Sequence, residues 1–259
     1  MKVKCPLKLS TRNIALTAIF AALYYVASLI LPSLYAVGVP NLQISLEALI
    51  ASVFGLVLGP YLGAVAAILG VGVTWMLPPS SFNPYGVPFL LSPPLNALTV
   101  GLIYYGKWKA AFAAFTVLIV TFLFLPPSQP LTENYIVPIA VLWDKIIALL
   151  LIIPTVMFRR LSNSKYLPFL FFFICFIGNQ VDNMWGTDVF AVPSVYQLFG
   201  FDLAATRAAF IISPFFYPAI RFVQALIGTI IAVPLMKALK NTNWIISERS
   251  IIEIKGTPP

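Results

Sequence analysis

The chain has 259 residues, of which 60% are hydrophobic and only 9% are charged, with a mean hydropathy of +0.95. So few charges cannot solvate a globular surface, and the apolar runs are long enough to cross a bilayer core, which takes about 20 residues, so composition excludes a soluble domain. The net charge of +8 is spread around the apolar runs, which favours a role in membrane topology over nucleic-acid binding.

Apolar segments follow one another along the chain, and each is expected to form a transmembrane helix. Their expected bounds are 14–31, 42–58, 61–77, 87–105, 109–125, 135–158, 166–186 and 208–239. The last segment contains prolines and is too long for one straight helix, so we expect 208–217 to be interfacial or a broken half-helix and the span itself to cover about 218–236. The fold class expected is an all-α integral membrane protein, a bundle of about eight transmembrane helices within a range of six to eight.

The basic residues predict the orientation of these spans. If the N-terminus is cytoplasmic, strict alternation places all of the 16 basic residues except Lys145, Arg207 and Arg221 on the cytoplasmic side. This bias is what the positive-inside rule expects. Both termini are then cytoplasmic, in a multi-pass protein of the plasma membrane. We expect one transmembrane domain over 1–240 and a short cytoplasmic tail over 241–259.

Small residues recur at every fourth position across the second and third segments, at Gly55, Gly59, Gly63 and Ala67. On a helix this spacing places them on one face, where they allow another backbone to approach closely. Gly59 and Pro60 join the two segments. Tight packing inside a helix bundle explains this pattern without any further function.

Polar side chains within the spans gather in the half nearer the outside, at depths taken from a helical rise of about 1.5 Å per residue. Ionisable groups inside a membrane are costly and commonly mark a pathway or pocket, so this clustering predicts an outward-facing binding site. The candidate substrate-binding residues are Glu47, Trp75, Asn96, Asp144, Asn179, Asp182, Arg221 and Gln224. The alternatives are an interfacial aromatic belt for Trp75, contact with headgroups for Glu47, and internal ion pairs that only fix helix packing for the other charged residues.

Two motifs and one helix end carry a resemblance to a known family. The motifs are TRNIALTAIFAAL at 11–23 and LGPYLGAV at 58–65, and the helix end is the close of the fourth segment at 101–106. Over about residues 10–110 the chain resembles the membrane-embedded, substrate-binding S components of energy-coupling factor (ECF) transporters, which are vitamin-uptake relatives of ABC importers. The stretch 214–239 looks like the closing helix of some archaeal-type members.

The resemblance implies a small-molecule substrate, a vitamin or similar micronutrient, bound with high affinity in an outward-facing pocket. It also implies that small residues of the first helix, here Ala18 and Ala22, dock onto a transmembrane coupling protein driven by two cytoplasmic ATPases. ATP is used by those partners, since this chain has no Gly-x-x-x-x-Gly-Lys-Ser/Thr phosphate loop. The loop over 32–41 is expected to gate the pocket. S components commonly have six spans rather than eight, so no ligand residue is carried over.

Other functional classes remain open from the residues alone. A self-sufficient carrier could couple a proton or sodium ion through Glu47, Asp144 or Asp182, although no convincing internal repeat supports one. A structural membrane scaffold is a further alternative. The chain has no histidine, which excludes His-based metal sites and His-dependent acid–base catalysis. We therefore expect no enzyme activity, no metal and no cofactor bound by this chain.

Overall fold

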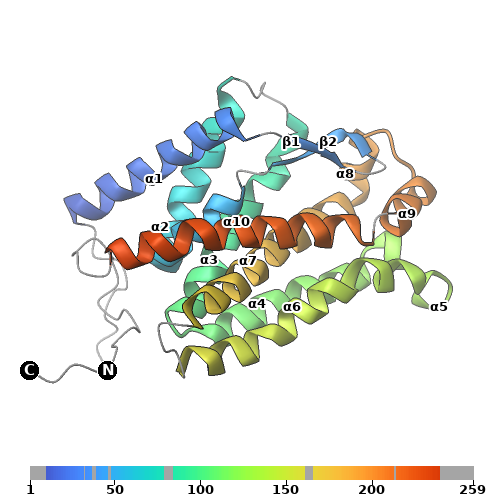
Figure 1. Ribbon diagram of the computed structural model, residues 1–259. Helices are drawn as coiled ribbons and strands as arrows, with labels where there is room; N and C mark the ends of the chain where they lie inside the picture. The colour runs from blue at the N-terminus through green and yellow to red at the C-terminus, as the bar shows by residue number, and fades with distance from the viewer. Residues whose placement is uncertain are drawn as a thin grey trace, which may run out of the picture.

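The computed structural model describes residues 10–31, 33–36, 39–45, 48–78, 84–160, 166–212 and 214–239 (Figure 1). In chain order the elements are α1 (Thr11–Ile30), β1 (Ser33–Ala36), β2 (Val39–Ser45), α2 (Ala48–Met76), the 3-10 helix η1 (Pro84–Leu91), α3 (Ser92–Tyr104), α4 (Trp108–Phe124), the 3-10 helix η2 (Pro126–Ser128), α5 (Leu131–Asn134), α6 (Ile136–Arg160), α7 (Leu167–Phe190), α8 (Pro193–Leu198), α9 (Leu203–Ile212) and α10 (Phe216–Leu239).

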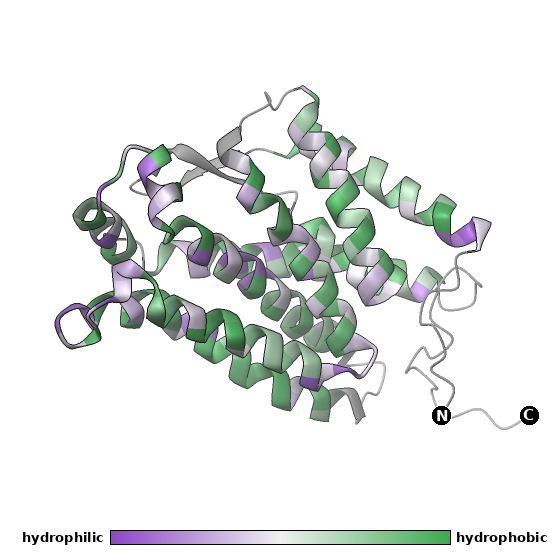
Figure 2. Ribbon diagram, turned by 180° about the vertical axis from the view of Figure 1, so that it is seen from behind, coloured by the Kyte–Doolittle hydropathy of each residue, from purple (hydrophilic) through white to green (hydrophobic). Residues whose placement is uncertain are grey.

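Six helical segments in the described part of the chain are long and apolar enough to cross a membrane. They are Thr11–Ile30, Leu49–Met76, Gly86–Tyr104, Ile136–Phe158, Leu167–Phe190 and Phe216–Leu239. Figure 2 shows that the long helices are hydrophobic along most of their length. Large apolar side chains remain exposed on the outer faces of α1, α6 and α10, as lipid allows but water would not. The protein is therefore a multi-pass helical membrane protein.

The eight expected segments do not appear as eight long helices. The segments 42–58 and 61–77 fall largely on the single 29-residue element α2, and the segment 109–125 corresponds to the shorter helix α4 of 17 residues. The expected all-α class is confirmed, since the long elements are all helices. One short antiparallel hairpin of β1 and β2 was not expected, and it includes the first residues of the expected span 42–58. The expected break before the last span is confirmed, because the segment divides into α9 and α10, but α9 lies about five residues earlier in the chain than the expected half-helix 208–217.

Helix α2 is broken at Gly59, where the chain folds back on itself. Gly59 has φ 80° and ψ 177°. Residues other than glycine disfavour this positive φ because they carry a Cβ, and Pro60 follows directly. A Cβ placed on Gly63 would lie 2.8 Å from the carbonyl oxygen of Phe54. These residues are nine apart, which in a continuous helix would separate them by about 13 Å. The two parts of α2 therefore pack against each other as a helical hairpin.

The same glycine pattern brings α3 against this hairpin. A Cβ on Gly55 would lie 2.2 Å from the carbonyl oxygen of Ala97, and a Cβ on Gly101 would lie 2.5 Å from the Cα of Pro60. The expected close approach of backbones is thus confirmed at Gly55 and also at Gly63. Gly59 has a different role, since it makes the turn. Large side chains such as Phe54, Phe115 and Phe171 fill the core between the helices.

The bundle has two ends, and different elements lie at each. In Figure 1 the start of α1 and the end of α10 lie together at one end, whereas the β1–β2 hairpin, α8, α9 and α5 lie at the other. At the first end Lys107, just before α4, donates a hydrogen bond to the Tyr61 hydroxyl next to the α2 turn, at 3.3 Å. At the second end Arg207 of α9 donates to backbone carbonyls of Pro126, Pro127 and Gln129. We call this second end the hairpin end.

Candidate functional site

Helix α7 carries a run of polar side chains that lie inside the protein. The run occupies the half of α7 that leads to α8, at the hairpin end (Figure 1). Its members are Asn179, Gln180, Asp182, Asn183 and Asp188, and all of them are buried. We call these five residues the α7 polar cluster. The helix continues past the end of the expected span 166–186 to Phe190.

One ion pair joins the cluster to α10. Nη2 of Arg221 lies 3.2 Å from Oδ1 of Asp182, and both side chains are more than nine-tenths buried. Nη1 of Arg221 donates a second hydrogen bond to Oε1 of Gln224 at 2.8 Å. Arg221 and Gln224 are three residues apart and so lie on one face of α10, which allows one guanidinium to serve both partners.

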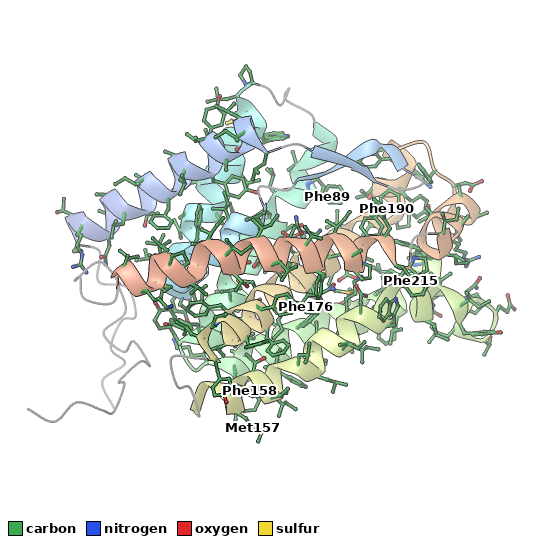
Figure 3. The ribbon with its side chains drawn as sticks, viewed as in Figure 1. Phe89, Met157, Phe158, Phe176, Phe190 and Phe215 are labelled. Carbon is green, nitrogen blue, oxygen red and sulfur yellow. The ribbon has the colours of Figure 1, made fainter. Side chains whose placement is uncertain are left out.

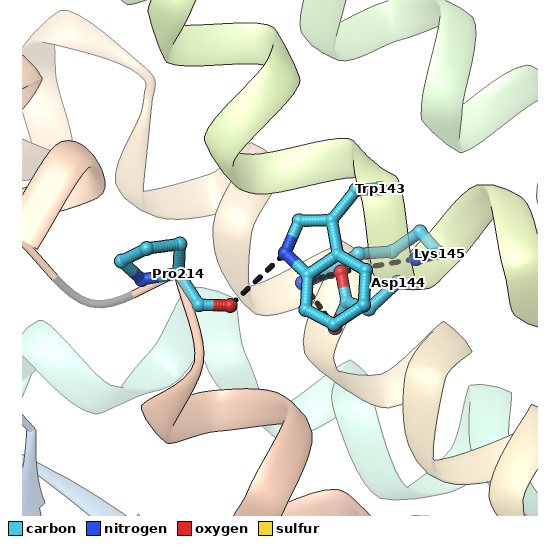
Figure 4. A network of polar contacts seen from close by, with 4 residues as sticks. All are labelled: Trp143, Asp144, Lys145 and Pro214. Carbon is cyan, nitrogen blue, oxygen red and sulfur yellow. Dashed lines mark hydrogen bonds and ion pairs between the residues drawn. The ribbon is translucent and has the colours of Figure 1, made fainter.

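A second ion pair lies on α6. Nζ of Lys145 is 2.9 Å from Oδ1 of Asp144, and the backbone N–H of Lys145 donates to that same oxygen (Figure 4). Lys145 is also within electrostatic range of Arg221. The four charges therefore balance, two acids against two bases. The internal ion pairs that were expected as an alternative role for Asp144, Asp182 and Arg221 are thus present.

A chain of buried hydrogen bonds connects α7 to α2 and α3. The hydroxyl of Ser52 donates to Oδ1 of Asn96 at 2.9 Å, and Nδ2 of Asn96 donates to Oδ1 of Asn179 at 2.9 Å. Glycine at position 178 makes this contact possible, because a Cβ there would lie 2.3 Å from Oδ1 of Asn96. Two of the predicted site residues, Asn96 and Asn179, are therefore in direct contact.

Many polar atoms of the cluster have no hydrogen-bond partner in the described part of the chain. They are Nδ2 of Asn179, both side-chain polar atoms of Gln180, Oδ2 of Asp182, Nδ2 of Asn183, both carboxyl oxygens of Asp188 and, on α10, Nε of Arg221. Leaving one buried polar group unpaired costs about 1–3 kcal/mol, and native proteins contain few such groups. The unpaired atoms are therefore concentrated on one half of α7 and on the residue of α10 that faces it, where water or another polar molecule could pair with them.

Aromatic side chains pack around the last turn of α7 at the hairpin end. The ring of Phe190 makes edge-to-face contacts with the rings of Phe199, Phe201 and Phe210, at centroid distances of 5.8 to 5.9 Å. Phe89 of η1 joins them through Phe199, and Figure 3 shows Phe89 and Phe190 at this end of the molecule. Two tryptophans donate hydrogen bonds to backbone carbonyls of nearby segments. Trp185 donates to the carbonyl of Pro88, and Trp143 donates to the carbonyl of Pro214 (Figure 4).

The remaining predicted residues lie elsewhere. Trp75 is in the last turn of α2, and a Cβ on Gly86 of η1 would lie 3.2 Å from its Nε1, so the indole packs against η1. Glu47, and part of the expected gate over 32–41, lie outside the described residues. Ala18 and Ala22 are exposed on the surface of α1, facing away from the bundle.

Sequence reasoning did not select three members of the cluster, Gln180, Asn183 and Asp188, as site residues. Gln180 and Asn183 are neutral amides. The only feature that could have marked them as site residues was their position near Asp182 in an apolar segment. Asp188 was missed for another reason. The span was expected to end at 186, which would have left this carboxylate in a solvated loop, whereas α7 continues past it and buries it to 6% exposure.

In the part of the chain that the structure describes, no group of three or more Cys, Asp or Glu side chains is placed to hold a metal ion. The unpaired polar atoms of the α7 polar cluster and of Arg221 belong to amide, guanidinium and carboxylate groups, which can hydrogen-bond to an organic molecule. Comparisons of the chain with protein-family models, with curated proteins and with solved structures gave no match.

Proposed function

We propose that this chain is the substrate-binding membrane subunit of an importer of the energy-coupling factor type, taking up a vitamin or related micronutrient. The observation that carries the proposal is the set of buried, unpaired polar atoms on the half of α7 at the hairpin end. An apolar bundle gains nothing from such groups, and a polar ligand would pair them. The resemblance of residues 10–110 to ECF S components supplies the transporter class.

The proposal includes a topology. Counting the two arms of α2 separately and including α4 gives eight crossings, with both termini in the cytoplasm and the hairpin end outside. Arg12 is in the first turn of α1 and Lys237 in the last turn of α10, and Lys107 and Lys109 are at the start of α4, so in this topology all four are cytoplasmic, as the positive-inside rule expects. Asn179 is 11 residues from the last residue of α7, about 17 Å along the helix, which is close to the bilayer midplane. The cluster then occupies the outer half of the plasma membrane.

Partners follow from the same proposal. Ala18 and Ala22 are exposed on α1 and separated by four residues, so a helix of a transmembrane coupling protein could approach α1 closely there. Two cytoplasmic ATPases would drive that coupling protein, since the chain has no phosphate-binding loop of its own. The chain itself needs no bound cofactor in this scheme, and no nucleic acid takes part.

An ion-coupled carrier is the second candidate, and the buried ion pairs favour it. Asp144–Lys145 and Asp182–Arg221 are charged groups inside a membrane domain, which in carriers commonly take part in proton or ion coupling. A structural scaffold is the third candidate, in which the pairs only hold helices together. A scaffold does not explain the unpaired atoms of Gln180 and Asp188.

Uptake and binding together separate these candidates. Native mass spectrometry of the purified protein would identify a co-purified small molecule, and its radiolabelled form would then be offered to cells with and without the coupling protein and ATPases. We expect binding in both and uptake only with the partners. Uptake without them would establish a carrier. Absence of any bound small molecule, in purified protein and in binding assays alike, would leave the scaffold.

A further inference from the structure

Among the buried charges of the described residues, Asp188 differs from the others. Asp144 has Lys145 and Asp182 has Arg221, each within 3.2 Å. Asp188 is 6% exposed, and neither of its carboxyl oxygens has a hydrogen-bond or ion-pair partner in the described part of the chain. Removing an ionised carboxylate from water without a counter-charge is far costlier than leaving an amide unpaired. Asp188 is therefore the one buried acid of the described residues that has no basic partner.

Asp188 shares one ridge of α7 with a second unpaired side chain. Gln180, Met184 and Asp188 follow one another at every fourth position. The side chains of Gln180 and Asp188, at the two ends of this ridge, are unpaired in the described part of the chain, and Met184 between them is fully buried. The ridge is about 12 Å long, and Asp188 is at its end nearer the hairpin end.

The two ends of the ridge differ in chemistry. The carboxylate of Asp188 has two free oxygens, which accept hydrogen bonds from a protonated nitrogen. The inner end differs, since the amide of Gln180 both donates and accepts and carries no charge.

We infer that the substrate of this site carries a positively charged nitrogen that pairs with Asp188, and that an uncharged hydrogen-bonding group of the same molecule reaches Gln180. This inference rests on the proposed function, since it names the chemical class of that cargo. It requires no change in the Asp144–Lys145 and Asp182–Arg221 pairs, which are already balanced.

The test uses full-length protein in lipid nanodiscs and three equimolar sets of small polar metabolites, cationic, neutral and anionic at neutral pH. Binding is detected by native mass spectrometry and measured by isothermal titration. We expect the tightest binders to be cationic. Asp188→Asn, which keeps the shape of the side chain, is expected to weaken their binding about 10- to 100-fold, as loss of a charged hydrogen bond does. The matched control is Asp202→Asn, at an exposed carboxylate that caps α9, which should leave binding unchanged.

The outcomes separate the inference from the proposed function. If the tightest binders are neutral or anionic, or if Asp188→Asn binds the cationic compounds as tightly as the wild type, the inference is wrong and the proposed function stands. If no compound of any class binds the wild type, the proposed function fails with it. Should Asp188→Asn not fold, the tightest cationic binder is compared with its uncharged carbon isostere on wild-type protein. Equal affinities for the two would overturn the inference.

Discussion

Replacing Arg221 with methionine tests whether the charges inside this bundle depend on one another. The guanidinium lies 3.2 Å from Oδ1 of Asp182 and also donates to Gln224, and both charged side chains are more than nine-tenths buried. Methionine retains much of the volume of the arginine stem but removes the charge and the donors. Asp182 would then be a buried carboxylate without a counter-charge.

The expected loss follows from the separation of the two groups. Two unit charges 3.2 Å apart attract each other by about 5 kcal/mol at an effective dielectric constant of about 20. Removing one partner of a buried ion pair costs about 3–5 kcal/mol, because the other charge stays desolvated. We therefore expect Arg221→Met to lower the free energy of unfolding by about 3–5 kcal/mol. The double variant Asp182→Asn/Arg221→Met has no unpaired charge and should regain most of that loss.

The free energy of unfolding would be measured by reversible titration with a denaturing detergent in mixed micelles, followed by circular dichroism. Arg12→Met serves as the control, because Arg12 is exposed in the first turn of α1 and its loss should change stability by less than about 0.5 kcal/mol. A loss below about 1 kcal/mol for Arg221→Met would refute the reasoning. A double variant no more stable than the single one would refute it equally.

Three further substitutions probe the packing and the partner surface. Gly178→Ala places a Cβ 2.3 Å from Oδ1 of Asn96 on α3, so we expect the free energy of unfolding to fall by about 1–3 kcal/mol and substrate binding to weaken. Unchanged values of both would show that α3 can move aside. Gly101→Ala places a Cβ 2.5 Å from the backbone of the α2 turn and should lower the thermal unfolding midpoint, whereas Gly72→Ala, with nothing within 4 Å, should not; equal midpoints would contradict the close packing. Ala18→Leu/Ala22→Leu should abolish ATP-driven uptake and spare substrate binding; loss of both activities together would mean that these alanines serve the fold instead.

Hydropathy was sufficient to predict most of the helices. The expected segments 14–31 and 135–158 differ by only a few residues from α1 and α6, because twenty consecutive apolar residues have few alternatives to a membrane helix. The hairpin of β1 and β2 was not predicted. An apolar run such as the start of 42–58 is compatible with strand or helix, and the pairing of β2 with a second segment decides between them.

The sequence predicted several residues of the site from their residue types, but it did not predict which residues pair with each other. An acid or amide in an apolar segment is unusual whatever the fold, which is how Asn96, Asp182 and Arg221 were selected. Which charge neutralises which depends on the packing of α7 against α10, and that could not be derived from their positions in the chain. The same packing leaves Asp188, which lies beyond the expected end of its span at 186, without a partner among the described residues.

By itself, then, the sequence determined that this chain is a membrane protein, the approximate bounds of most of its helices, the break at Gly59, and the accumulation of polar groups in selected spans. These properties depend on local composition, and a bilayer core accepts only segments that satisfy their own backbone hydrogen bonds. Tertiary structure alone decided that Asp182 pairs with Arg221 and that one carboxylate on α7 is left without a partner among the described residues. The reason is that such a pairing joins residues far apart in the chain, and no local pattern encodes the distance between them.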